Sequence, residues 1–258
     1  MTFYITPPSL LPKTDKRYKK WLKSLKKRPP VWNKGYTKEN NSSIARISAT
    51  MKRRGIDNFK GWRLQQIRSG KFLDAARRLE RTKELAELVG VILGDGNIHK
   101  FPRTEALTIA CNGDNKGFID RYANLVYKVF LKRPSINKTL TNCVKIRIYQ
   151  KYISKSLGIP TGARGKLATK IPTWILKNRE NLISYLRGLY EAEGSFSVHL
   201  PTYTYKFQFS NRNEFLLNNV YKGLKVLGFH PHRSKYQIQI SKKKEVYEAR
   251  ELLKFRQY

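Results

Sequence analysis

One helix-like motif occurs twice in this chain, and its repetition constrains the fold more than any other feature. The two stretches are LVGVILGDG at residues 88–96 and LRGLYEAEG at 186–194, each mostly apolar and each ending in an acidic residue followed by glycine. The acids are Asp95 and Glu193, which lie 98 positions apart. A helix end that recurs in this way indicates a duplicated structural unit.

The segments around the two motifs repeat the same order of elements. In the first copy, periodicity predicts helices at 84–93, 116–130 and 152–157, and strands at 97–101, 105–111, 135–139 and 143–149. In the second copy it predicts helices at 181–192, 213–227 and 245–255, and strands at 195–200, 203–210, 231–234 and 236–241. We therefore predict an α+β fold of tandem αββαββα repeats, with an N-terminal extension at 1–83 and repeats at 84–165 and 166–258.

The net charge of the chain is +35, from 53 Lys and Arg against 18 Asp and Glu. A field this positive opposes a compact state unless a polyanion neutralises it. Lys and Arg contacts to phosphates supply most of the non-specific affinity for nucleic acid, so nucleic acid is the expected partner. No stretch approaches the roughly 18 apolar residues of a membrane-spanning helix. We expect no membrane partner, no secretion, and a cytoplasmic (nucleoid-associated) or organellar location.

The N-terminal extension is about twice as basic per residue as the rest of the chain. It holds 23 Lys and Arg against 5 Asp and Glu, with helices expected at 16–27 and 42–54. Aromatic residues interleaved with basic ones suit a surface that follows a nucleic-acid backbone. We expect DNA contacts from Trp32, Lys34 and Arg46. The alternative is that the aromatic residues attach a small satellite domain to the rest of the protein.

Small residues four apart give each motif a helix strip without side-chain bulk. The pairs are Gly90 with Gly94, and Gly188 with Ala192. Such strips let two helix backbones approach closely, for a steric reason that holds in any medium. We therefore expect these four residues to form an interface between the two motif helices.

Helices paired in this way would end side by side, which would bring Asp95 and Glu193 together. A carboxylate at a helix C-terminus opposes the helix dipole, so it needs another reason to be there. Two close acids in a basic surround suit Mg²⁺, which takes one or two carboxylates together with waters and phosphate oxygens. Metal-assisted phosphodiester hydrolysis is the chemistry that fits. The alternative, a helix stop before a hairpin, explains one Gly-Asp-Gly but not its recurrence.

The two motifs resemble the paired signature of the LAGLIDADG homing endonucleases in their single-chain form. The resemblance covers roughly residues 84–258 and includes KIPTWI at 170–175, just before the second motif. It implies a pseudo-twofold fold in which the motif helices form the interface, and each half lays a four-stranded antiparallel sheet along the DNA major groove. It also implies a metal site at Asp95 and Glu193, with Gly94 and Ala192, and a cut that leaves short 3′ overhangs.

The same resemblance implies a lysine beyond the last strand of each half, which orders water near the phosphate. Internal alignment gives Lys151 and Lys243 this role, with Lys242 as a rival for the second. The alternative is that they are ordinary solvated lysines. We expect Mg²⁺ as the cofactor, Mn²⁺ as a substitute, and Ca²⁺ to bind without cleavage. Because both motifs are present in one chain, we expect a monomer.

One face of each sheet should pack on helices, which leaves alternate residues of the other face to read DNA. Arg and Gln can pair bidentately with guanine and adenine edges. The expected DNA-contacting residues are Lys138, Lys145, Arg147 and Tyr149 in the first half, and Ser195, Ser197, His199, Tyr203, Tyr205, Gln208, Lys235, Gln237 and Gln239 in the second. A register error of one residue would exchange the two faces.

The segment WNKGYTKE…SIARISATMK within 32–52 resembles the modular nuclease-associated DNA-binding motifs attached to some homing endonucleases. It implies an arm that lengthens the recognised site. The sequence thus predicts a site-specific double-strand DNA homing endonuclease, free-standing or intron-encoded. Three alternatives stay open: an intron RNA maturase on the same scaffold, a catalytically silent sequence-specific DNA-binding protein, and a basic structural nucleic-acid protein.

Overall fold

The computed structural model describes residues 11–27, 29, 31–69, 78–163 and 167–258. The chain divides into two compact units, Met1–Phe72 and Leu73–Tyr258. The boundary expected after residue 83 falls inside the second unit, where Lys83 begins a helix. The boundary expected between residues 165 and 166 lies outside the described residues.

The described residues of the first unit form three helices, and none of the residues in these helices is buried. They are α1 (Lys16–Lys26), α2 (Ser42–Arg53) and α3 (Lys60–Arg68). α1 and α2 begin at side-chain caps, because Asp15 accepts a hydrogen bond from the Arg17 N–H and Asn41 accepts from Ser43 and Ile44. These helices are therefore held by local interactions and present their aromatic and basic side chains to solvent.

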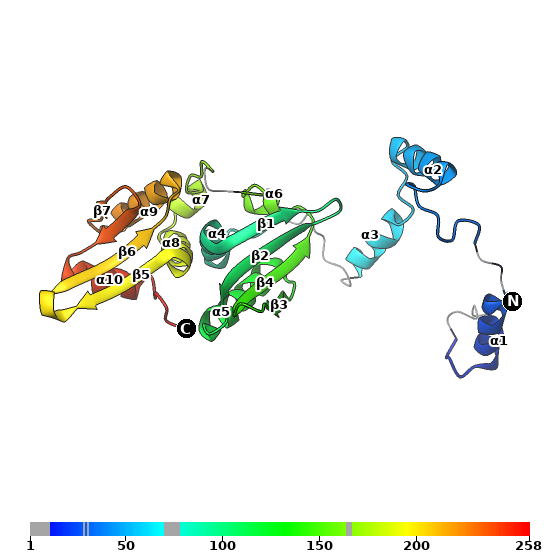
Figure 1. Cartoon of the computed structure of the whole chain (residues 1–258), viewed down its shortest axis with the longest axis horizontal. Helices are drawn as coiled ribbons and strands as arrows, with labels where there is room; N and C mark the ends of the chain where they lie inside the picture. Colours follow the sequence, from blue (N-terminus) through cyan, green and yellow to red (C-terminus); the bar gives the residue numbers. More distant parts are fainter. Residues whose placement is uncertain (1–10, 28, 30, 70–77, 164–166) are drawn as a thin grey trace. The chain divides into compact units, whose positions relative to one another are not determined.

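The second unit contains two copies of the same element order (Figure 1). The first copy is α4 (Lys83–Asp95), β1 (Gly96–Lys100), β2 (Glu105–Asn112), α5 (Lys116–Phe130), β3 (Ser135–Lys138), β4 (Cys143–Gln150) and α6 (Ile153–Leu157). The second is α8 (Arg179–Glu193), β5 (Gly194–His199), β6 (Thr204–Ser210), α9 (Glu214–Val226), β7 (His232–Arg233), β8 (Gln237–Ile240) and α10 (Lys243–Leu252). The short helix α7 (Thr173–Leu176) comes before α8.

Each copy builds a four-stranded antiparallel sheet, ordered β1-β2-β4-β3 in the first and β5-β6-β8-β7 in the second. The predicted tandem αββαββα fold is confirmed by this shared strand order. In both sheets the strand that follows the motif helix runs outward, and the next strand returns to the motif helix.

One face of each sheet packs on helices and carries the core. Alternate residues of β6 are buried, with Phe207 and Phe209 fully enclosed, and Tyr190 of α8 stacks on Phe207 at a centroid distance of 4.3 Å. In the first half, Leu107 and Ile109 of β2 are buried in the same way. The period of two leaves the intervening polar residues on an open face, as expected for a sheet with one buried side.

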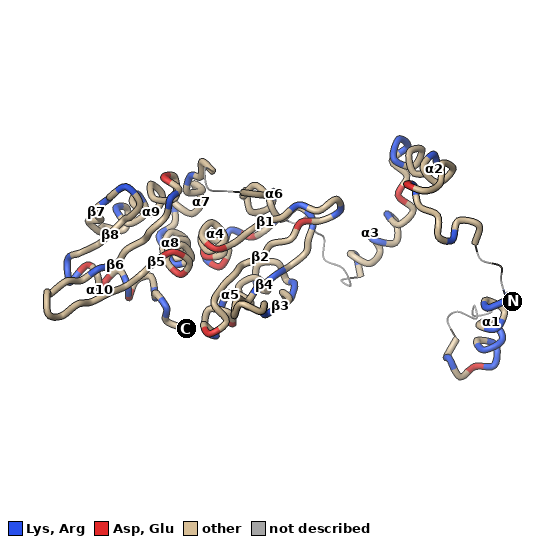
Figure 2. The backbone as a smooth tube through the Cα atoms, in the orientation of Figure 1, with Lys and Arg blue, Asp and Glu red and all other residues tan. Residues whose placement is uncertain are grey.

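Lys and Arg residues are spread over both repeats, and the motif helices α4 and α8 also carry Asp and Glu (Figure 2). Among the residues that the structure describes, no helix combines the length and the apolar character needed to cross a membrane.

Candidate active site

The motif helices α4 and α8 pack directly against each other at their glycines. A Cβ atom added to Gly90 would lie 2.2 Å from the Tyr185 carbonyl oxygen, and one added to Gly188 would lie 2.1 Å from the Glu87 carbonyl oxygen. Farther along, a Cβ on Gly94 would lie 2.4 Å from the Cβ of Ala192. All four predicted interface residues therefore lie where the two backbones meet, and any larger side chain would separate the helices.

Local sequence fixes where these helices start. Thr82 caps α4 by accepting a hydrogen bond from the Leu85 N–H at 3.3 Å, and Asn178 caps α8 by accepting from Asn181 at 3.0 Å. Each first turn also carries a glutamate, which the helix dipole favours.

Glycine is needed at the ends of both helices for close approach. Gly96 and Gly194 have ordinary extended backbone, with φ of −85° and −89°. A Cβ on Gly96 would lie 2.6 Å from the Ile92 Cα, and one on Gly194 would lie 2.4 Å from the Tyr190 carbonyl oxygen. The strand thus leaves the helix with no room for a side chain, directly after the acidic residue.

Asp95 and Glu193 are the last residues of α4 and α8, and both are half-buried. They lie close together, since a Cβ on Gly94 would be 3.4 Å from the Glu193 Cγ. Burial, together with the negative charge of Glu193, raises the pKa of Asp95 to about 7. Burial also raises the pKa of Glu193, against a hydrogen bond from Asn211 that lowers it. The site thus holds two carboxylates that are costly to ionise together.

The two carboxylates differ in the hydrogen bonds that they accept from the protein. The Asn211 side-chain amide donates to Glu193 Oε1 at 3.2 Å. Its counterpart in the first half, Asn112, instead accepts from the Asp114 N–H at 2.9 Å and from Asn142 at 3.2 Å. No described residue donates a hydrogen bond to the Asp95 side chain. Asn211 is a site residue that the sequence reasoning did not assign, although its match to Asn112 in the repeat was the available signal.

The residues present fit a divalent cation. Two partly desolvated carboxylates, one without a protein donor, offer hard oxygen ligands whose mutual repulsion a cation would relieve. Within the described ranges no group of three or more His, Cys, Asp or Glu could hold a metal ion. The remaining ligands would therefore have to be waters and phosphate oxygens, as Mg²⁺ prefers.

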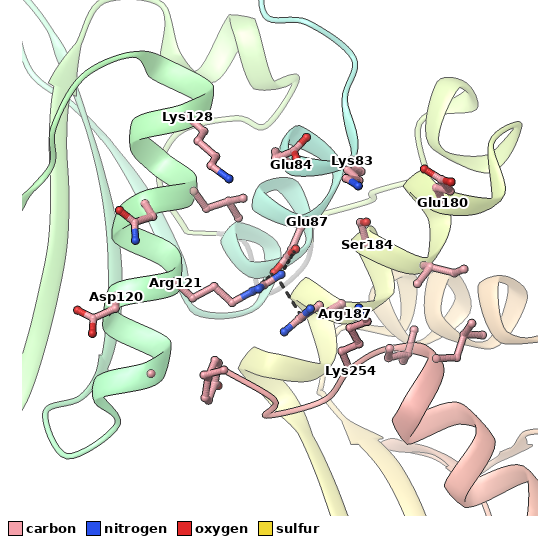
Figure 3. Close-up of a pocket in the computed structure, with 17 residues that line it drawn as sticks. Lys83, Glu84, Glu87, Asp120, Arg121, Lys128, Glu180, Ser184, Arg187 and Lys254 are labelled. Atoms are coloured by element: carbon pink, nitrogen blue, oxygen red, sulfur yellow. Dashed lines mark hydrogen bonds and ion pairs between the residues drawn. The ribbon is translucent and has the colours of Figure 1, made fainter.

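At the other end of the helix pair, opposite charges meet (Figure 3). Glu87 of α4 accepts two hydrogen bonds of 2.7 Å from Arg121 of α5, and Arg187 of α8 lies 3.6 Å from the same carboxylate. These residues line a cleft of about 980 Å³. Arg187 and Glu87 are buried, so the charges are balanced across the interface between the halves.

Glu191, the buried acid two residues before the tip of α8, belongs to that balanced network, because its Oε1 lies 4.0 Å from Arg187 Nε. Its Oε1 accepts from the Arg256 N–H at 2.8 Å, and its Oε2 accepts from the Tyr258 hydroxyl. The first half has the buried Leu93 at the matching position. Glu191 therefore ties the C-terminal residues to α8 and does not reach the Asp95–Glu193 pair.

No family model and no curated protein sequence matches the chain. Solved structures do show similarity. "The crystal structure of I-DmoI in complex with DNA and Mn" has 18% identity and a TM-score of 0.47, over 67% of this chain and 97% of that one. The N-terminal LAGLIDADG domain of DUF199/WhiA has 19% identity and a TM-score of 0.47, over 69% and 86%. Full-length DUF199/WhiA from Thermatoga maritima has 19% identity and a TM-score of 0.49, over 69% and 57%.

The assignment of the fold rests on the paired motif helices and the matched strand orders. The chain has the two-motif LAGLIDADG fold.

The LAGLIDADG sheets do not bring Lys151 or Lys243 to the carboxylates. Gly96 pairs with Ile109 and Ile109 with Ile146, so Lys151 lies five residues farther out, about 17 Å at the strand rise of about 3.3 Å. Lys243 begins α10 at the outer end of β8, with its Nζ 5.4 Å above the Tyr205 ring, and Lys242 pairs with Glu245. Predicting these lysines as catalytic was wrong because β4 and β8 run away from the motif helices.

Most of the predicted DNA-reading residues lie on the open faces. Lys145, Arg147 and Tyr149 alternate with buried residues of β4. On the second sheet, the open face carries Ser195, Ser197, His199, Gln208, Gln237 and Gln239. Tyr203 and Lys235 are exposed in the turns that connect β5 to β6 and β7 to β8. The open faces also include Asn97, Thr108 and Lys206, which the sequence analysis left out.

Two of the predicted DNA-reading residues lie on the wrong face. Tyr205 is only 7% exposed, because it shares the helix-covered side of β6 with Phe207. Lys138 pairs with the buried Val144 and so shares its side of the sheet, while its neighbour Asn137 pairs with Lys145 on the open face. Both corrections follow from the period of two, which a strand boundary alone does not fix.

The residues predicted to contact DNA from the N-terminal unit are all exposed. Trp32 is 65% exposed, Lys34 is exposed beside it, and Arg46 is exposed on α2. Large apolar side chains of this unit, such as Phe59 and Trp62, are also at least half exposed. The described part of this unit therefore presents a surface that is both basic and apolar.

Proposed function

We propose that this protein is a site-specific double-strand DNA endonuclease that hydrolyses phosphodiester bonds with a divalent cation held between Asp95 and Glu193. The observation that carries the proposal is the closeness of these two half-buried carboxylates at the ends of paired helices, where the pKa of Asp95 is raised to about 7. Charges of the same sign are not brought together in a partly buried site to stabilise a fold, so a cationic ligand is the physical reason for them.

The chain's own residues would have separate roles in metal binding and DNA binding. A divalent cation, when bound, supplies charge neutralisation at the scissile phosphate and lowers the pKa of a water. Asp95 and Glu193 would hold it, and Asn211 would keep the Glu193 carboxylate oriented. The open sheet faces would position the duplex, because they are polar and basic. They include β1 and β5, the strands that begin directly after the two acids. The basic N-terminal unit would add phosphate contacts beyond the sheets.

Several finer points belong to the same proposal. We propose Mg²⁺ as the physiological ion, with Mn²⁺ as a substitute, and action as a monomer that leaves short 3′ overhangs. I-DmoI has been solved with DNA and Mn, with DNA and Ca and, as a variant, with its target DNA in the presence of Mg, and a divalent cation is consistent with these structures. We further propose residues 1–83 as the DNA-binding extension, followed by the two repeats.

Cleavage of a selected target by matched variants tests the proposal. A target would first be isolated by incubating the full chain with a randomised duplex library and Mg²⁺, and sequencing the cut products. Asp95→Asn and Glu193→Gln should each lower the single-turnover cleavage rate by about 10³-fold or more, while the Kd for the uncut target in Ca²⁺ changes by less than about threefold. Asp120→Asn and Glu214→Gln, at exposed acids of α5 and α9, serve as controls.

The outcomes separate the alternatives. Wild-type cleavage by both acid variants would overturn the assignment of the site. Specific binding of a duplex without cleavage in Mg²⁺ or Mn²⁺ would indicate a catalytically silent DNA-binding protein. Preferential binding of intron RNA over any duplex, measured by gel shift, would indicate a maturase.

A further inference from the structure

The two sheets carry matching rows of residues across their open faces. In the first sheet, Asn97 pairs with Thr108, Thr108 with Arg147, and Arg147 with Ser135. In the second, Ser195 pairs with Gln208, Gln208 with Gln239, and Gln239 with His232. Each row begins two residues after a motif carboxylate, so the two rows occupy the same place in the two halves. The pairing therefore makes Arg147 and Gln239 equivalent positions.

A second pair of equivalent positions lies one row nearer the motif helices. Lys145 pairs with Ala110, and Gln237 pairs with Ser210. The first half thus has Lys and Arg on β4, where the second half has two glutamines on β8. None of these four side chains is buried, and all are on the open faces.

Arg147 is held in a fixed orientation before any ligand arrives. Its Nε donates to the Thr108 hydroxyl at 2.9 Å, and its Nη1 donates to the Tyr149 hydroxyl at 3.3 Å. No described residue takes the remaining N–H groups at the tip of its guanidinium. A guanidinium fixed in this way offers donors and no acceptor, which matches the O6 and N7 acceptors of guanine in the major groove.

The glutamines offer a different pattern. Gln239 donates from its amide nitrogen to the Ser241 hydroxyl at 2.6 Å, which orients the amide, and no described residue pairs with the Gln237 side chain. An amide carries both a donor and an acceptor. Adenine presents the matching acceptor N7 and donor N6 in the major groove, whereas guanine presents two acceptors.

We propose that the two half-sites of the DNA target differ in base composition because of this exchange. Lys145 and Arg147 specify G·C pairs in one half, and Gln237 and Gln239 specify A·T pairs at the pseudo-twofold-related positions of the other half. The target is therefore not a palindrome, and these four side chains set its orientation. This inference rests on the proposed function only in taking duplex DNA as the ligand, and it requires no cleavage.

Exchanging the two pairs of side chains tests the proposal. The full chain is incubated with a randomised duplex library in Ca²⁺, and the bound fraction is sequenced after several rounds. The variant with Lys145→Gln, Arg147→Gln, Gln237→Lys and Gln239→Arg should move the G·C preference to the equivalent positions of the other half and leave the rest of the site unchanged. Each mismatched position should weaken binding by about tenfold.

A single-site variant and a control complete the test. Arg147→Gln alone should replace the preference for G by one for A at one position, in keeping with the different edges that the two side chains match. Lys138→Gln, at an exposed lysine on the helix-covered side of β3, removes the same charge away from the open face and should leave the base preference unchanged.

The two possible failures are distinguishable. If the wild-type chain enriches no duplex sequence at all, the proposed function fails. If it enriches a site but the exchanged variant selects the same bases at the same positions, or if the wild-type site is palindromic there, the inference about the half-sites is overturned.

Discussion

The two ends of the α4–α8 helix pair handle charge in opposite ways. At the end near the helix N-termini, Glu87 is matched by Arg121 and Arg187 within the protein. At the other end, about 12 Å along the helix at about 1.5 Å per residue, Asp95 and Glu193 face each other with the same sign of charge. The same close packing encloses both ends. One end is therefore satisfied by the fold, and the other is the end at which the proposed function places a cation from outside.

Removing the balanced charge should have the largest effect on stability. Glu87→Gln leaves Arg121 without its carboxylate and Arg187 with only the more distant Glu191 at 4.0 Å, so we expect a loss of about 3 kcal/mol in the free energy of unfolding. Urea denaturation followed by circular dichroism measures it. Glu180→Gln, at an exposed glutamate in the first turn of α8, should cost less than about 0.7 kcal/mol. Equal losses in the two variants would contradict the structural role of the network.

A larger residue where α4 meets α8 should weaken both the Glu87 network and the Asp95–Glu193 site. Gly188→Ala places a Cβ 2.1 Å from the Glu87 carbonyl oxygen and 2.7 Å from the Val91 nitrogen, both of them rigid backbone atoms. We expect a loss of about 2–3 kcal/mol, and weaker metal binding because the carboxylates separate. In Gly223→Ala the new atom meets only leucine methyl groups at 3.0 Å or more, so that control should lose under about 1 kcal/mol.

Relieving the unbalanced end should stabilise the metal-free protein. The folded pKa of Asp95, about 7, is above its usual value near 3.8, so the folded state binds this proton more tightly than the unfolded state does. Stability from this group is therefore present at low pH and is lost as the pH rises towards 7. Asp95→Asn should gain about 1–2 kcal/mol at pH 8, after discounting for solvent screening, and almost nothing at pH 4. Denaturation with EDTA at both pH values checks this, and a gain of equal size at both would contradict it.

Adding the cation should give the smallest shift. Mg²⁺ at about ten times its Kd should stabilise the wild type by about 1.4 kcal/mol at pH 8, seen as a rise in Tm. The rise should shrink at pH 5.5, because protons compete for Asp95. Asp95→Asn and Glu193→Gln should show little rise at either pH. A rise of wild-type size in both variants would place the cation elsewhere.

Much of the fold could be predicted because it depends on period and repetition. The predicted helix at 116–130 coincides with α5, and the strand at 105–111 differs from β2 by one residue. α3 and α7 were not predicted, since α3 has no apolar periodicity and α7 is a single turn. The close meeting of Gly90 and Gly188 could be anticipated because a strip of small residues has one steric use on a buried helix.

The candidate site was only partly predictable. A strand's sequence shows which residues alternate but does not tell which end of the strand is near the motif helices, so Lys151 and Lys243 were placed wrongly. Tyr205 has a hydroxyl that could contact DNA and a ring that could pack in the core. Only the pairing of β6 showed that this side chain lies on the buried face. The Asn211 contact with Glu193 depends on where β6 returns to α8, which no local pattern records.

The sequence by itself determined that this protein is a duplicated αββαββα fold with one acidic residue at each motif tip, because periodicity and internal repetition are properties of the chain. Only the tertiary structure decided which charges are partnered. Glu87 and Asp95 are both acids of α4, yet arginines from two other helices surround the first, while a second carboxylate meets the other. Such electrostatics depend on distances between residues far apart in sequence, and those distances exist only once the helices have packed.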